Sequence, residues 1–188
     1  MPTIPVFYAT TEGHTQKIAE TIAAVLREEG YESEAVDVAR HEEPFPWLDA
    51  VSAVLGGSLH AGRHQRALSA FAAREAAHLN ARPSAFFSVS LSAGSRNPTE
   101  VDAAHGLATA FTRDAGWTPR RIACFPGKLA YTQYGFFIRL VMRRIARKEG
   151  GPTDTHRDHD LTDWAAVRTF AKGVAADARA ALGVRAAS

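Results

Sequence analysis

The sequence has few or none of the features that define several large classes of protein. It contains a single cysteine, Cys124, which excludes an internal disulfide framework and any metal site built from several cysteines. It has no run of about 18 apolar residues without a charge, so no membrane-spanning helix is expected. Residues 1–5 carry neither a basic cluster nor a long apolar run, unlike a secretory signal. These absences favour a reducing, cytoplasmic setting.

What is present is typical of a folded globular protein. Hydrophobic residues make up 46% and charged residues 22% of the chain, a balance that excludes a disordered polypeptide. The length of 188 residues predicts one domain, which we expect to span residues 1–182, followed by a short tail at residues 183–188.

Charge is distributed unevenly along the chain. Residues 1–50 hold 3 basic and 10 acidic side chains, whereas residues 51–148 hold 14 basic and 4 acidic side chains. A basic middle beside an acidic start indicates that one face meets an anionic partner. Nucleic acid, anionic lipid and a carboxylate-bearing substrate all have this chemistry. Scattered, solvated arginines are the alternative interpretation.

Short apolar runs alternate with amphipathic patterns from one end of the chain to the other. This alternation predicts a parallel sheet with helices on both faces. At this size the commonest such fold is the flavodoxin-like three-layer α/β sandwich, with a five-stranded parallel sheet in the order 2-1-3-4-5, and its ligands bind beyond the carboxyl ends of the strands. The expected strands are residues 3–9, 34–38, 50–56, 84–91 and 121–126, and the expected helices are residues 14–29, 65–80, 99–116, 135–148 and 161–182.

The loop after the first expected strand has the composition of a phosphate-binding loop. Thr10, Thr11 and Thr15 supply hydroxyls, and Gly13 lets the backbone approach a ligand closely. The helix that follows supplies free N–H groups and the positive end of its dipole. Neither a Walker lysine nor a G-x-G-x-x-G motif is present, so one phosphate held by neutral donors is favoured over a nucleoside triphosphate or a dinucleotide. The alternative is that Thr11 or Gly13 simply caps the helix.

This loop, T-x-E-G-x-T, resembles the phosphate loop of flavodoxins, which holds the phosphate of FMN. The segments at residues 55–64 (LGGSLHAGRH), 83–91 (PSAFFSVSL), 150–155 (GGPTDT) and 162–164 (TDW) extend the similarity to about residue 178. Together they resemble the flavodoxin-like, menaquinone-dependent protoporphyrinogen oxidases of bacterial haem synthesis. The resemblance implies oxidation of protoporphyrinogen IX to protoporphyrin IX, with FMN as cofactor and a membrane quinone as electron acceptor.

The resemblance also implies which residues hold FMN. The first loop grips the phosphate, while the loops after the third and fourth strands edge the isoalloxazine ring. No side chain is an evident catalytic acid or base. His60 and His64 are surface histidines in the alternative interpretation, although either is able to relay protons near neutral pH. The implied contacts are Thr10, Thr11, Glu12, Gly13, His14 and Thr15 in the first loop, Ser58, Leu59, His60, Ala61 and Gly62 in the second, and Ser90, Leu91, Ser92, Ala93 and Gly94 in the third. Tyr131 follows the fifth strand and is expected to reach the same site, with a surface tyrosine as the alternative interpretation.

The propionate groups of a porphyrinogen require cationic partners in the protein. The loop after the fourth strand, residues 95–98, is shorter here than the basic loop that the family carries at this position. Arg63 and Arg96 are the arginines left near the expected site, and we take them as the candidates for substrate binding.

Residues 128–148 form a basic segment with six Lys and Arg residues and no Asp or Glu. On a helical wheel at about 100° per residue, Phe136 and Leu140 lie among Arg143 and Arg147 rather than with the other apolar side chains. This mixture predicts contact with an anionic membrane surface, which would place the protein peripherally on the inner face of the cell membrane. A protein-binding surface is the alternative. No nucleic-acid recognition motif accompanies the charge, so a nucleic-acid partner is not expected.

Two other functions fit a flavin-binding chain. One is a flavodoxin-type electron carrier, which the basic middle disfavours because such carriers usually dock through acidic surfaces. The other is an FMN-dependent quinone or NAD(P)H reductase. Residues 154–160 contain two histidines and three aspartates, but their spacing matches no strong metal motif. Helix capping and solvation explain them better, and no metal is expected.

Overall fold

The structure is a computed structural model that describes residues 1–41, 45–129, 132 and 154–187. Its centre is a parallel sheet in which the strands follow the order β2-β1-β3-β4-β5. This order confirms the predicted flavodoxin-like sandwich. The strands are β1 (Val6–Ala9), β2 (Ala35–Asp37), β3 (Ala53–Ser58), β4 (Ser84–Ser90) and β5 (Arg121–Pro126).

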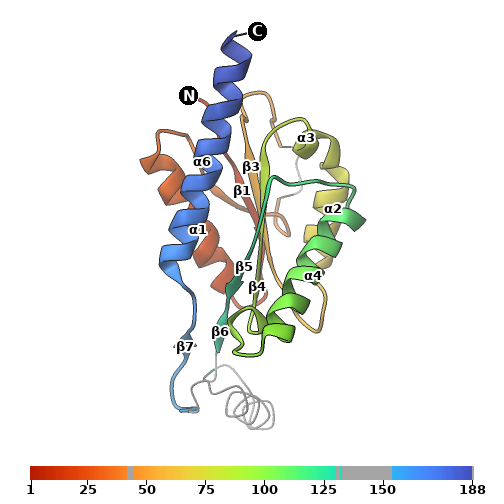
Figure 1. The fold of residues 1–188 in the computed structure, drawn as a ribbon, viewed down its shortest axis with the longest axis vertical. Helices are drawn as coiled ribbons and strands as arrows, with labels where there is room; N and C mark the ends of the chain where they lie inside the picture. The colour runs from red at the N-terminus through yellow and green to blue at the C-terminus, as the bar shows by residue number, and fades with distance from the viewer. Residues whose placement is uncertain (42–44, 130–131, 133–153, 188) are drawn as a thin grey trace.

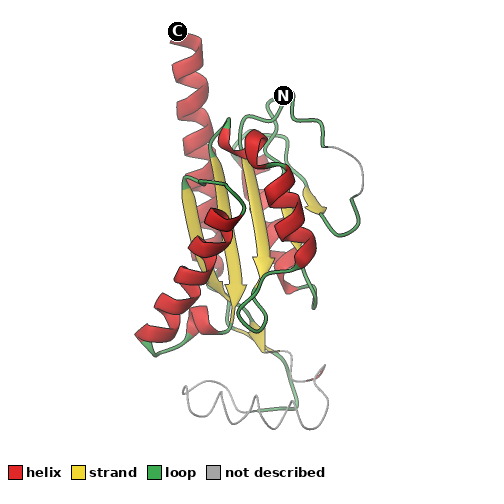
Figure 2. Ribbon diagram, turned by 90° about the vertical axis from the view of Figure 1, so that its right-hand side faces the viewer, coloured by secondary structure: helices red, strands yellow, loops and turns green. Residues whose placement is uncertain are grey.

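Helices cover both faces of the sheet (Figure 1). The helices α1 (His14–Glu28) and α6 (Trp164–Ala187) pack on one face, and α2 (Arg66–Arg74), α3 (Ala76–Asn80) and α4 (Pro98–Asp114) cover the other. Figure 2 shows the arrowheads of the strands pointing to one common edge of the sheet, where the loops of the predicted site emerge.

Two hydrophobic cores lie on the two faces, because successive side chains of a strand point to opposite sides. In β1, Val6 and Tyr8 enter the core under α1 and α6, whereas Phe7 enters the core under α2 and α4. Cys124 packs against the second core, and burial raises the pKa of its thiol to about 11. The thiol is therefore protonated at neutral pH, as a packing role requires.

Two strands are shifted from their expected bounds: β1 begins at Val6 instead of residue 3, and β3 spans Ala53–Ser58 instead of residues 50–56. The helices differ most at three places. The expected helix at residues 65–80 is divided into α2 and α3 at Glu75, whose buried carboxylate accepts a hydrogen bond from the Trp47 indole at 2.8 Å. The helix α4 begins at Pro98, because the Asn97 side chain caps it by accepting a hydrogen bond from the Thr99 N–H. The helix α6 begins at Trp164 and continues to Ala187, through most of the expected tail.

A short antiparallel pair, β6 (Lys128–Leu129) with β7 (His159–Asp160), continues from the end of β5 and was not predicted. Strands of two residues are too short to show the alternation by which a strand is recognised in sequence. The expected helix at residues 135–148 lies outside the described residues. No helix within the described part of the chain has the length and apolar character needed to span a bilayer.

Candidate functional site

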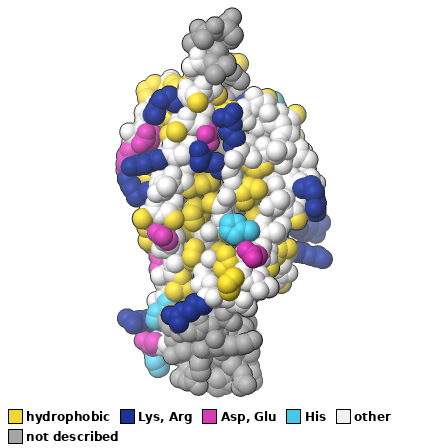
Figure 3. Space-filling model, viewed as in Figure 1, with side chains coloured by type: hydrophobic (Ala, Val, Ile, Leu, Met, Phe, Trp, Pro, Cys, Tyr) yellow, Lys and Arg dark blue, Asp and Glu magenta, His cyan; other side chains and the backbone are white. Residues whose placement is uncertain are grey.

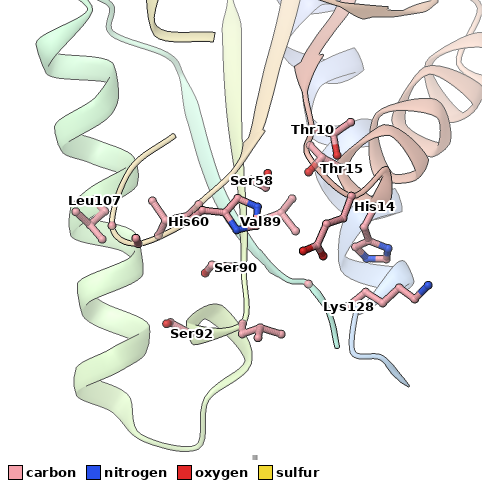
Figure 4. Close-up of a pocket in the computed structure, with 16 residues that line it drawn as sticks. Thr10, His14, Thr15, Ser58, His60, Val89, Ser90, Ser92, Leu107 and Lys128 are labelled. Carbon is pink, nitrogen blue, oxygen red and sulfur yellow. The ribbon is translucent and has the colours of Figure 1, made fainter. Parts of the chain in front are cut away.

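A hollow of 480 Å³ lies at the edge of the sheet where the strands end. Figure 4 shows its two sides, with Thr10, His14 and Thr15 at one end and Leu107 of α4 at the other. Ser58, Val89 and Ser90 lie between these ends. The complete lining is Thr10, Glu12, His14, Thr15, Ser58, Leu59, His60, Ala61, Gly62, Val89, Ser90, Leu91, Ser92, Leu107, Gly127 and Lys128.

Most residues expected at the site line this hollow, from all three predicted loops. Four of the expected residues, Thr11, Gly13, Ala93 and Gly94, support the loops without lining the hollow. Tyr131 and the expected membrane-contact residues Phe136, Leu140, Arg143 and Arg147 lie outside the described residues.

The start of α1 presents unpaired donors to one end of the hollow. Gly13 precedes the helix in a left-handed conformation at φ 79°, and its N–H donates to Thr10 Oγ1 at 3.0 Å. The first helical hydrogen bond runs from the Lys17 N–H to the Gly13 carbonyl, so the N–H groups of residues 14–16 have no helical acceptor. No side chain caps them and the first turn holds no acidic residue. Gly13 is therefore the N-cap of α1, as the alternative interpretation expected. The N–H groups of residues 14–16 nevertheless remain available to an anion.

His14 braces the first loop against the distant end of the chain. Its Nε2 lies 2.7 Å from Thr162 Oγ1 and 3.6 Å from Asp160 Oδ1. Burial lowers the pKa of His14, while Asp160 opposes that shift. Asp160 also pairs with Lys17 at 3.2 Å, and the Lys17 ammonium lies over the Trp164 ring. Since burial favours the neutral imidazole, the anion attraction of this end rests mainly on backbone dipoles.

The second loop is a tight reverse turn. His60 and Arg63 exchange backbone hydrogen bonds of 2.9 and 3.0 Å. Between them, Ala61 and Gly62 have positive φ values of 48° and 76°, as a tight hairpin turn requires. Ala61 is the one non-glycine residue with positive φ within the described ranges, so this turn stores backbone strain.

Gln65 connects the first and second loops, and sequence reasoning missed it. Its amide nitrogen donates to Ser58 Oγ and, at 3.4 Å, to Thr11 Oγ1. Its Oε1 is buried without a hydrogen-bond partner among the residues that the structure describes. Gln65 directly precedes α2, and nothing in its position along the chain marks it as a link between loops.

The third loop turns back onto the sheet after Ser90. The Ser90 hydroxyl accepts a hydrogen bond from the Ala93 N–H at 3.1 Å, and residues 92–94 form a short 3-10 turn. A Cβ on Gly94 would lie 3.0 Å from the Pro126 ring. Ala93 and Gly94 therefore shape this loop against the end of β5, while Ser90, Leu91 and Ser92 face the hollow.

The two histidines of the second loop have different surroundings. His60 is exposed and lines the hollow. His64 is half-buried, with Nε2 at 2.9 Å from Ser88 Oγ and ring contacts to Phe86 and Phe111. Burial lowers its pKa to about 4, so the imidazole is neutral at physiological pH. The interpretation of a surface histidine is therefore wrong for His64.

The arginines expected to bind substrate are separated. Arg63 is exposed and borders a second hollow beside the first. Arg96 is also exposed, in the loop before α4, and lines neither hollow.

The acidic run near β7 is occupied by local contacts. Asp154 pairs with Arg157 at 3.2 Å, and Asp158 pairs with Lys128 at 2.7 Å. The Lys128 ammonium and hydrogen bonds from Thr132 lower the pKa of Asp158 to about 2. Within the described ranges no group of three or more His, Cys, Asp and Glu side chains is arranged to hold a metal ion.

Residues that sequence reasoning did not assign to the site are Val89, Leu107, Gly127 and Lys128. Val89 was counted only as part of a buried strand. Gly127 and Lys128 reach the hollow because β5 continues directly into β6. Leu107 comes from the middle of α4, where an apolar side chain looks like any other core residue of an amphipathic helix.

Comparison with known proteins identifies the family. Residues 5–156 match the family model of the flavodoxin domain. The chain is 34% identical to protoporphyrinogen IX dehydrogenase (quinone) of Escherichia coli (strain K12), over 90% of this chain and 93% of that protein. This chain belongs to that family. The protein of the same name from Leishmania major is also 34% identical, over 93% of this chain and 75% of the Leishmania protein.

Solved structures show the same fold at low sequence identity. Flavodoxin 1 of Bacillus cereus is 16% identical with a TM-score of 0.55, covering 90% of this chain and 95% of that one. A flavodoxin of Streptococcus pneumoniae is 14% identical with a TM-score of 0.56, covering 93% and 98%. The protein is thus a flavin-dependent oxidoreductase of the flavodoxin fold, with FMN as its cofactor.

The hollow fits FMN at both ends. The unpaired N–H groups of α1, with the Thr10 and Thr15 hydroxyls beside them, suit a phosphate. The remainder of the hollow has apolar side chains from Leu59, Val89 and Leu107 and hydroxyls from three serines. An apolar slot with a few polar groups is the usual lining for a planar ligand.

Proposed function

We propose that this protein oxidises protoporphyrinogen IX to protoporphyrin IX and passes the electrons to a membrane quinone, in the synthesis of haem. The observation that carries the proposal is the 34% identity to the Escherichia coli enzyme across nearly the full length of both chains. The hollow at the carboxyl edge supports it, because its lining comes from the loops that the resemblance assigned to FMN.

In this proposal, the first loop holds the cofactor phosphate. The backbone N–H groups at the start of α1 and the hydroxyls of Thr10 and Thr15 donate to it, with no lysine or arginine required. The turn of residues 58–62 edges one side of the ring, and residues 90–92 edge the other. FMN supplies the hydride and electron transfer when bound, while the protein supplies position and surroundings.

No side chain is assigned as a catalytic acid or base. Four titratable side chains line the hollow: Glu12, His14, His60 and Lys128. Glu12 and His60 are exposed, His14 is hydrogen-bonded to Thr162, and Lys128 is paired with Asp158. Burial disfavours the charged form of His14, which lowers its pKa. In this proposal the protein binds and orients its ligands, and protons exchange with solvent through the open hollow.

A membrane quinone requires that the enzyme reach the bilayer. Lys128, the first residue of the basic segment, lines the hollow itself. We propose that this segment holds the enzyme on anionic lipid, so that the quinone meets the site from the membrane side. Replacing Phe136 and Leu140 with Ser should reduce sedimentation with vesicles that contain anionic lipid, while the melting temperature stays that of the parent. Unchanged sedimentation would disprove the membrane contact.

Anaerobic turnover tests the reaction directly. The FMN-loaded protein should convert protoporphyrinogen IX to the fluorescent porphyrin when menaquinone is present, and should not do so without an acceptor. The same protein is then offered a flavodoxin partner protein and, separately, NADH or NADPH. Reduction of the partner protein without porphyrin formation would indicate an electron carrier, and oxidation of a nicotinamide without porphyrin formation would indicate a soluble reductase.

A further inference from the structure

A second hollow, of 350 Å³, opens between α2 and α4 directly beside the FMN hollow. The two share Gly62 of the second loop and Leu107 of α4. Leu107 lies at the end of the FMN hollow away from Thr10 and Thr15 (Figure 4). The second hollow therefore adjoins the end where the cofactor ring, not its phosphate, is proposed to lie.

The lining of this second hollow joins an apolar floor to a basic rim. Ala73, Ala110 and Phe111 form apolar surface, and Arg63 and Arg66 supply two guanidinium groups. The neutral His64 ring forms part of the wall and is held by Ser88 and the neighbouring aromatic rings. Figure 3 shows Lys and Arg side chains at the right-hand edge of the molecule, on the side where α2 and α4 lie, and an acidic side chain nearer the middle of that view.

Arg63 and Arg66 differ from most arginines of this protein in their surroundings. Arg74, Arg121, Arg168 and others pair with carboxylates. Arg63 and Arg66 have no such partner among the residues described. The one carboxylate of the lining, Asp114, is already paired with Arg113 at 3.0 Å.

The backbone fixes where Arg63 stands. Its N–H and carbonyl are both hydrogen-bonded to His60 across the reverse turn, so Arg63 is held in the second hollow next to Gly62, which both hollows share. Arg66 follows at the first residue of α2. A guanidinium presents several parallel N–H donors and binds carboxylates with two hydrogen bonds. Two unneutralised guanidiniums above an apolar floor suit an apolar ligand that carries carboxylate arms.

We infer that the second hollow is a subsite for the carboxylate arms of the substrate, bound by Arg63 and Arg66 while the reacting ring system lies over the cofactor hollow. This inference rests on the proposed function and replaces Arg96 with Arg66 in substrate binding. Because Gly62 lies between the hollows and lacks a side chain, a ligand can cross from one to the other at this point.

Titration of the FMN-loaded protein with protoporphyrin IX and with its dimethyl ester tests the subsite. The double variant R63Q/R66Q should bind the dicarboxylate roughly tenfold or more weakly, as expected for the loss of charged hydrogen bonds. It should bind the uncharged ester as the parent does, and FMN affinity should stay unchanged. R96Q and R120Q are matched controls, since these exposed arginines also lack a carboxylate partner within the described chain yet line neither hollow.

Each other outcome overturns the inference. Parent-like binding of protoporphyrin IX by R63Q/R66Q, an equal loss for the ester, or a comparable loss in R96Q would remove the two arginines from carboxylate binding. Failure of the proposed function looks different: the parent would then fail to turn over protoporphyrinogen IX, whether or not its porphyrin binding depends on Arg63 and Arg66. If the parent turns over this substrate and R63Q/R66Q has an unchanged KM, the function stands and the subsite falls.

Discussion

The two ends of the FMN hollow are built by different means. At the α1 end, polar contacts join the first loop to residues more than a hundred positions away, through His14, Lys17 and Asp160. At the α4 end, the aromatic rings of Phe86 and Phe111 pack with His64 beneath a short turn. At the first end Lys17 is paired with Asp160, while the second hollow that adjoins the α4 end holds Arg63 and Arg66 without a carboxylate partner among the described residues. The difference indicates a fixed cofactor cradle beside a site that waits for an anionic ligand.

The largest expected effect concerns the α4 end. The pKa of His64 is about 4 in the folded protein, below its value of about 6.5 in an unfolded chain. The unfolded state therefore takes up a proton first, so stability is complete above about pH 6.5 and declines as the pH falls towards 4. The loss should reach roughly 3 kcal/mol. Chemical denaturation at pH 7 and pH 4.5 should record about 2 kcal/mol of this loss, because the loss is complete only below pH 4.

H64F separates this histidine from the other titrating groups. The variant keeps a ring beside Phe86 and Phe111 but has no proton to gain. Between pH 7 and pH 4.5 it should therefore lose less stability than the parent, by the amount that His64 contributes. H78F is the matched control, because the His78 ring stacks on Trp47 and lines neither hollow. Its stability should depend on pH as that of the parent does. An identical pH dependence in H64F and the parent would show that His64 is not the buried neutral group.

The α1 end is tested through its hydroxyls. T10V and T15V keep similar side-chain shapes and remove the donors beside the start of α1. Each should weaken FMN binding by about 1 kcal/mol or more, and the double variant by about 2 kcal/mol, roughly 30-fold in Kd. Quenching of flavin fluorescence reports the affinity. T21V is the control, because that hydroxyl bonds the Lys17 carbonyl one turn farther along α1; an equal effect in T21V would point to helix stability instead of phosphate contact.

His14, Lys17, Asp160 and Thr162 form the polar cluster that we call the brace. The smallest change in unfolding free energy is expected from its exposed member, Lys17. K17M removes the ion pair with Asp160 and the contact over Trp164. Because the Lys17 side chain is 60% exposed, the change in unfolding free energy should be only about 0.5 kcal/mol. Lys172 is an exposed lysine of α6 outside this cluster, so K172M should leave the unfolding free energy unchanged. A loss above about 2 kcal/mol in K17M would mean that the brace carries much more of the stability than exposed pairs usually do.

Sequence patterns were enough for the sheet and most of the loops. The alternation of buried runs with amphipathic runs predicts the parallel sheet, the size of the chain favours the strand order that the structure confirms, and Gly13 and the threonines around it mark the expected phosphate loop. Short elements and long-range links were not predictable in this way. The pair β6 and β7 is two residues long on each side, and the contact of Gln65 with Ser58 depends on where two loops meet in space. The role of Arg96 stays a prediction: its loop could be named from the sequence, but that it lines neither hollow is known only from the structure.

The brace between His14 and Thr162 spans 148 positions of the chain. During synthesis the phosphate loop leaves the ribosome early, whereas Thr162 and α6 follow near the end. The nascent chain therefore carries an unbraced loop through most of translation, and domains generally complete their folding as units. We therefore expect the cofactor to be captured late in biogenesis, and a ribosome-stalled chain that stops before β7 to retain little flavin.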